Sequence, residues 1–150
     1  MVTEIETLLI AAVLMATLTA APSVTDGSTH VRPRSSVAQS VVDDAVRVSP
    51  TVEMMIAAIE RTDVFVYVDA RFTALSSRGA TRLVGAGVTS RFVEVTINVS
   101  LTRDHRAEVL GHELQHVLEI AHASDVRDTA GMKQLFDRIG WRTDTDYETA

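Results

Sequence analysis

The stretch RAEVLGHELQHVLEIAHA, residues 106–123, decides the fold, because its apolar residues recur at the spacing of one helix face. That face carries Leu110, Leu114, Val117 and Ala121, and the opposite stripe carries His112, His116 and Glu119. Just upstream, Thr102 and Asp104 are both residue types that cap the N-terminus of a helix. The stretch therefore predicts an amphipathic helix that packs one face on a core and presents metal-binding side chains on the other.

The sequence on the N-terminal side of this helix predicts the rest of an α+β domain. Apolar residues at helical spacing indicate a helix over residues 37–48, and Ser49-Pro50 is a typical start for a second one, ending near residues 61–63. VFVYV, residues 64–68, predicts a short strand that is covered on both faces. Residues 70–82 predict an exposed connection, and residues 83–88 predict a second strand.

Residues 92–99 alternate between apolar and polar side chains, which predicts a half-buried strand of a hairpin or meander with Glu94, Thr96 and Asn98 facing solvent. After the 106–123 helix, Ser124 or Asp125 is expected to cap a further helix that stops at Gly140. The fold class predicted is thus α+β, with a small mixed or antiparallel sheet, the 106–123 helix packed on it, and further helices.

The N-terminal part differs in composition from the rest. Residues 8–21 are apolar and uncharged, a length that suits a signal peptide better than a membrane-spanning helix. We expect residues 1–21 to be a signal peptide or membrane-associated leader, with an ordinary N-terminal helix as the alternative. Residues 22–36 are then a flexible polar linker and residues 37–150 the domain. This organisation predicts export to the periplasm or exterior, with membrane contact only through an uncleaved N-terminal segment.

Composition excludes several function classes. The net charge of -6 argues against nucleic acid as a partner, because nucleic-acid binding needs a basic excess. The arginines at 71, 78, 82 and 91 are interpreted as loop solvation. The chain has no cysteine, so it has neither disulfides nor thiolate metal ligands. Any metal ion must be held by His, Asp or Glu.

The polar stripe has the spacing of a zinc site. His112 and His116 lie one helical turn apart, so both imidazoles can reach one tetrahedral ion. Glu113 lies roughly 100° around the helix from His112, beside the position left open on the ion. There it can take a proton from a water molecule activated by the metal and pass it to a leaving amine.

His112-Glu113-Leu114-Gln115-His116 resembles the HExxH signature of the zincin class of zinc metallopeptidases. The resemblance covers residues 64 to about 122, and GHELQHVLEIA looks like small uncharacterised bacterial proteins with only this domain. It implies a Zn2+ cofactor, a peptide or protein substrate, and Glu113 as general base. Zincins also place an antiparallel edge strand beside the substrate, and residues 92–99 are expected to supply it.

The third metal ligand stays open on sequence. Glu119 continues the histidine stripe, and could bind the ion or accept a hydrogen bond from a histidine ring. Glu148 fits the gluzincin plan, which the resemblance favours, and His122 stands where metzincins have their last histidine, but Glu119 replaces the glycine of their motif. Asp125 and Asp128 are expected to be helix caps.

Two functions follow from this sequence. The first is a zinc-dependent metallopeptidase that hydrolyses a peptide bond, with His112, His116 and Glu119 as the metal ligands and Glu113 as the base. The alternative is a non-catalytic zinc-binding or interaction domain that retains the zincin scaffold, because a chain of this length has few residues for a second lobe beside the substrate.

Overall fold

The structure, a computed structural model, describes residues 29–73, 77–142 and 147–149. Along the chain the elements are β1 (Val31–Pro33), α1 (Ser36–Val48), α2 (Pro50–Ile59), β2 (Val64–Arg71), β3 (Gly79–Ala86), β4 (Arg91–Asn98), α3 (Arg103–His122), α4 (Thr129–Ile139), β5 (Gly140–Arg142) and β6 (Tyr147–Thr149). Over the described residues, the predicted α+β class is confirmed, with a four-stranded mixed sheet and four helices.

The main sheet has the strand order β1-β2-β4-β3. β1, β2 and β4 run parallel, whereas β3 runs antiparallel to β4 and occupies the edge. β5 and β6 form a separate antiparallel pair. β2 extends to Arg71 and β3 begins at Gly79, so the predicted connection over 70–82 is shorter and the predicted strand over 83–88 begins earlier.

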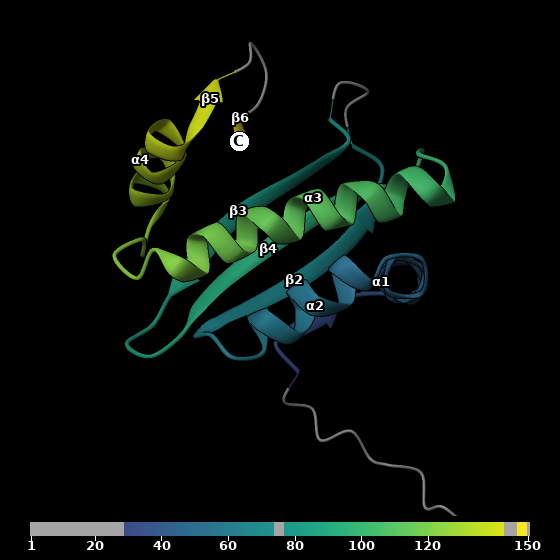
Figure 1. The fold of residues 1–150 in the computed structure, drawn as a ribbon, viewed down its shortest axis with the longest axis horizontal. Helices are drawn as coiled ribbons and strands as arrows, with labels where there is room; N and C mark the ends of the chain where they lie inside the picture. The colour runs from purple at the N-terminus through teal and green to yellow at the C-terminus, as the bar shows by residue number, and fades with distance from the viewer. Residues whose placement is uncertain (1–28, 74–76, 143–146, 150) are drawn as a thin grey trace, which may run out of the picture.

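The hydrophobic core lies between one face of this sheet and α1, α2 and α3, which all lie on the same side (Figure 1). Because strand side chains alternate between faces, every second residue of β2 and β4 points into this core. The strand residues that are fully buried there are Val64, Val66, Val68, Val93, Val95 and Ile97. α3 lies over the middle of the sheet, broadly along the direction of the strands (Figure 1), and contributes Leu110, Leu114, Val117 and Ile120. This packing fixes which face of α3 is left for function.

Local capping residues determine where the helices begin. The hydroxyl of Ser49 accepts a hydrogen bond from the backbone N–H of Val52, and Pro50 opens α2, as the sequence predicted. The prediction of a helix start at Ser124 or Asp125 is wrong. Asp128 is the N-cap, because its carboxylate accepts from the N–H of Gly131 at 2.7 Å. Gly140 ends α4, as predicted.

β1 and the first residue of α1 lie within residues 22–36, the segment predicted to be a flexible linker. Val31 pairs with Val66 and buries its side chain, and the carboxylate of Glu60 accepts from the N–H of His30 at 2.8 Å. The predicted leader, residues 1–21, lies outside the described residues. In the part of the chain that the structure describes, no helix is long and apolar enough to cross a membrane.

β4 is an interior strand, so its prediction as a half-buried edge strand is wrong. Its polar residues Glu94, Thr96 and Asn98 are buried on the sheet face opposite α3. Guanidinium groups of Arg34, Arg71 and Arg82 contact the Glu94 carboxylate and cover it. Burial raises the pKa of Glu94, but the Arg82 hydrogen bond and the three positive charges outweigh it and hold the pKa below its ordinary value.

The interpretation of Arg91 as a loop arginine is also wrong. Its side chain is only 1% exposed and donates to the Asp63 carboxylate at 2.6 and 2.9 Å. It also donates to carbonyl oxygens at the end of α3 and just beyond it, those of Ile120, Ala121, Ala123 and Val126. The hydrogen bond from Arg91 lowers the pKa of Asp63. Arg91 therefore fixes the C-terminal end of α3 to β4 and to the turn after α2.

Candidate metal centre

α3 carries the predicted site and is fixed at both ends. At its start, the hydroxyl of Thr102 accepts from the backbone N–H of His105, so of the two predicted caps Thr102 is the one used. At its end, Arg91 donates to the carbonyl oxygens of Ile120 and Ala121, in the last turn of the helix, where intrahelical donors run out. The helix between them places His112 and His116 on successive turns of one face.

The two histidine rings face each other through their Nε2 atoms, which are 3.0 Å apart. The ring centroids are 4.6 Å apart and the rings are nearly perpendicular, at 88°. His112 is exposed, whereas His116 is buried and meets the Phe136 ring edge to face at a centroid distance of 5.2 Å. The prediction that α3 brings these two imidazoles together is therefore confirmed.

Glu119 contacts the other nitrogen of the second histidine. Its Oε2 lies 2.9 Å from Nδ1 of His116, and its Oε1 accepts from the side-chain amide of Gln115 at 3.3 Å. A carboxylate only accepts hydrogen bonds, so the ring proton of His116 belongs on Nδ1. Nε2 of His116 then presents its lone pair toward His112. This contact is the one that the orienting role expected for Glu119 requires.

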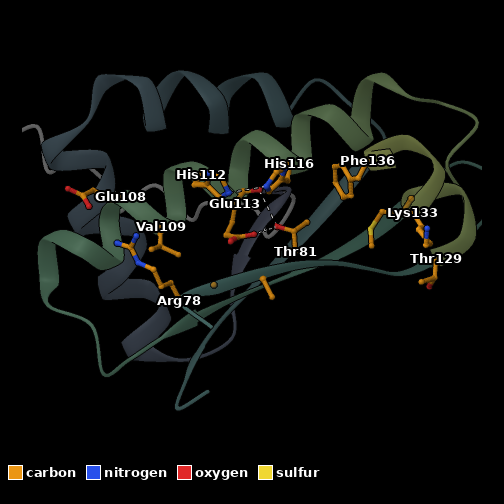
Figure 2. Close-up of a pocket in the computed structure, with 13 residues that line it drawn as sticks. Arg78, Thr81, Glu108, Val109, His112, Glu113, His116, Thr129, Lys133 and Phe136 are labelled. Atoms are coloured by element: carbon orange, nitrogen blue, oxygen red, sulfur yellow. Dashed lines mark hydrogen bonds between the residues drawn. The ribbon is translucent and has the colours of Figure 1, made fainter. Parts of the chain in front are cut away.

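Glu113 points from α3 toward the edge strand β3 (Figure 2). Its side chain is 6% exposed, and its Oε2 accepts from the hydroxyl of Thr81 at 2.6 Å. The residue of β3 beside this carboxylate is Gly79. A Cβ at position 79 would lie 2.7 Å from Oε1 of Glu113 and 2.5 Å from Cγ1 of Val109. Only a residue without a side chain leaves room at position 79 for the carboxylate.

The two histidines and Glu113 line one cavity of about 670 Å³ between α3, β3 and α4. β3 contributes Gly79, Ala80 and Thr81 to its wall, and α4 contributes Thr129, Met132, Lys133 and Phe136, as Figure 2 shows for the labelled residues. Arg78 and Glu108 lie at its rim. The cavity therefore combines apolar wall residues with two imidazoles and the carboxylates of Glu113 and Glu108, a composition typical of a ligand site.

No third ligand joins the two imidazoles within the described residues, where no group of three or more His, Asp or Glu side chains converges. α3 stays helical from Glu119 to His122, so the chain does not change direction there. His122 is exposed. Asp128 caps α4, as expected for a helix cap. Glu148 lies in β6 opposite Trp141, but its side chain is outside the described part of the chain.

Sequence reasoning missed two residues of this site, Thr81 and Gly79. Both lie in the segment interpreted as an exposed connection, and their role depends on the pairing of β3 with β4. The alternation of Gly79, Thr81 and Leu83 toward one face was the available signal, because Leu83 is buried in the core. The expectation that residues 92–99 supply the antiparallel edge strand is wrong, and β3 takes that place.

Comparisons of this chain with protein-family models, with curated proteins and with solved structures found no match.

Proposed function

We propose that this chain is a zinc-dependent metallopeptidase of the HExxH type, with a zincin-like arrangement of its site. The observation that carries the proposal is the pair of Nε2 atoms of His112 and His116, which face each other while Glu119 holds the outer nitrogen of His116. At this distance the lone pair of His116 meets either the ring N–H of His112 or a cation that both nitrogens share. A metal ion satisfies both nitrogens at once.

The donor set fits zinc. Two nitrogen ligands of a tetrahedral zinc ion, each at about 2.0–2.1 Å, lie about 3.3 Å from each other. The observed separation of 3.0 Å between the two Nε2 atoms is close to that value. Two imidazoles in a cysteine-free chain suit Zn2+ better than Ca2+ or Mg2+, which prefer oxygen ligands. Glu148 is the candidate for third ligand, because Glu119 is already bonded to His116.

Each residue then has a role in peptide hydrolysis. His112 and His116 would hold the ion, and Glu119 keeps the proton of His116 on Nδ1. Zinc, when bound, supplies a Lewis acid that polarises the scissile carbonyl and makes water more acidic. Glu113 takes the proton of the attacking water and delivers it to the leaving amine. The low exposure of Glu113 keeps bulk water from competing for that proton.

The edge strand supports a peptide as substrate. The backbone N–H of Leu83 meets Sδ of Met132 in α4, so it points away from β4. Backbone groups alternate in direction along an antiparallel strand, so those of Thr81 and Gly79 also point away from β4. These two residues line the cavity. An extended peptide can therefore pair with β3 and carry its scissile bond past Glu113.

The test is cleavage of a peptide library by the full chain with zinc, with a chelator, and by the variant Glu113→Gln. We expect zinc-dependent cleavage that falls at least about 100-fold in E113Q, while zinc binding is retained. Glu108→Gln is the matched control, because Glu108 lies on the same helix at the rim of the same cavity. E113Q cleaving as fast as the parent would contradict the mechanism. Zinc binding without any cleavage would favour the non-catalytic zinc-binding domain.

We also propose that residues 1–21 direct the chain out of the cytoplasm, because they carry a 14-residue apolar stretch over 8–21. Cell fractionation of the full chain tests this proposal. Recovery in the periplasm or medium, or on the membrane, supports it, whereas recovery of the full-length chain in the cytoplasm contradicts it.

A further inference from the structure

The carboxylate of Glu113 is enclosed by residues from a different element. Its Oε2 accepts from the hydroxyl of Thr81 at 2.6 Å, and its Oε1 lies only 2.7 Å from the point where a Cβ at Gly79 would stand. Both partners lie on β3, two residues apart, with their side-chain positions on the face that looks toward α3. Together they hold both carboxylate oxygens against the edge strand.

We infer that Thr81 is a positioning residue for the general base, and that β3 supplies it for this purpose. The inference rests on the proposed peptidase function and extends it to a residue outside the HExxH motif. Thr81 Oγ1 also lies 3.3 Å from the backbone carbonyl of Glu113, but a hydroxyl has a single hydrogen to donate. The shorter contact to the charged oxygen takes that hydrogen.

The consequence for catalysis is geometric. A glutamate side chain has three rotatable bonds, so a carboxylate without a partner samples several positions in a cavity of this size. The hydroxyl of Thr81 selects one of them, on the wall that the proposed peptide substrate would follow. Because β3 would also pair with that peptide, a single strand sets the distance between the base and the scissile bond.

The experiment compares the full chain with Thr81→Val and Thr81→Ser in zinc-dependent peptide cleavage. Valine keeps the shape of threonine and removes the hydroxyl, and serine restores the hydroxyl. Loss of a residue that orients a metal ligand typically costs about 10- to 100-fold in activity, and we expect a similar loss for the partner of the base. We expect T81V to lose that factor in kcat with KM and zinc affinity within about twofold of the parent, and T81S to recover most of it.

Thr96→Val is the matched control for loss of a buried hydroxyl. Thr96 lies one strand away, on β4, and its hydroxyl contacts Arg71 on the opposite face of the sheet. A purely structural effect of losing a hydroxyl would appear in T96V as well as in T81V. We expect kcat of T96V to stay within about twofold of the parent.

A second measurement does not depend on activity. In a double-mutant cycle on the unfolding equilibrium, Thr81→Val and Glu113→Ala are expected to be coupled by a factor of about 10. Absence of coupling, or a T81V enzyme as fast as the parent, overturns the positioning role while the peptidase function stands. If the parent has no zinc-dependent cleavage, the proposed function fails, and any coupling observed makes the pair structural, which also overturns this inference.

Discussion

Replacing Gly79 with alanine tests how closely α3 packs against β3. The added Cβ would lie 2.5 Å from Cγ1 of Val109 and 2.7 Å from Oε1 of Glu113. Ordinary contacts begin at 3.4 Å, so these fall short by about 0.9 and 0.7 Å. No glycine in the described residues has a positive φ, so alanine meets no backbone strain at this position. The expected penalty is therefore purely steric.

Overpacking of this kind typically costs about 1–3 kcal/mol, and we expect G79A to lose that much free energy of unfolding. Gly85→Ala is the matched control on the same strand, because its Cβ would meet only Phe92, at 4.0 Å. We expect G85A to be neutral or to gain up to about 1 kcal/mol from reduced backbone freedom. Urea denaturation followed by far-ultraviolet circular dichroism gives both values.

The same substitution displaces the carboxylate of Glu113. A shift approaching 1 Å in a group that acts on the substrate can cost about 100-fold in rate, so G79A is also expected to be a poor enzyme. If G79A were as stable as G85A, with an unchanged denaturant slope, α3 would not pack closely against β3 at Gly79. The positions assigned here to Glu113 and Thr81 would then be refuted.

Three further predictions concern the supports of the site. Arg91→Met should lose about 2–4 kcal/mol of unfolding free energy, because it removes the buried donor to the carbonyls of Ala121 and Val126 and the ion pair with Asp63. Exposed Arg82→Met should lose about 1 kcal/mol or less, and urea denaturation of both variants checks this. Folding lowers the pKa values of Asp63 and Glu94 from their ordinary values of 3.8 and 4.5. The two carboxylates therefore stabilise the fold fully above the ordinary pKa values, and this stabilisation is lost as the pH falls through the lowered pKa values. Unfolding free energy should therefore be steady near neutral pH and decline below about pH 4.5, less steeply in R91M; a flat profile down to pH 3 would contradict this. Glu119→Gln should weaken zinc binding about 10- to 100-fold without abolishing it, measured by competition with a chelator, and complete loss would instead make Glu119 a ligand.

The local features of this fold could be predicted from sequence. Ser49-Pro50 opens α2 and Thr102 caps α3 because these signals act through neighbouring backbone groups. The spacing of His112 and His116 likewise fixes their position on one helix face, and the structure brings their Nε2 atoms together. Such features depend only on residues a few positions apart.

The features that sequence reasoning misjudged depend on distant partners. Glu94 and Arg91 carry the charge pattern of exposed residues, yet both are buried by partners 12 to 60 positions away, such as Arg82, Arg34 and Asp63. A charged side chain can be buried when oppositely charged groups surround it, and no periodicity along the chain reveals those groups.

The same reasoning explains what sequence could not show about the site. The contact between Thr81 and Glu113 joins residues 32 positions apart, and it follows from the antiparallel pairing that makes β3 the edge strand. The sequence allows Glu119 to be either a metal ligand or an orienting partner of a histidine. Only the side-chain geometry around His116, with the Glu119 carboxylate on Nδ1, favours the second.

The most direct test of the central claim is the zinc content of the purified full chain after dialysis, measured by atomic emission. We expect about one zinc ion per chain, lost in His112→Ala and in His116→Ala. His105→Ala, on the same helix and exposed, should keep it. A parent chain without zinc, or zinc content unchanged in H112A and H116A, would contradict the assignment of these two histidines as metal ligands.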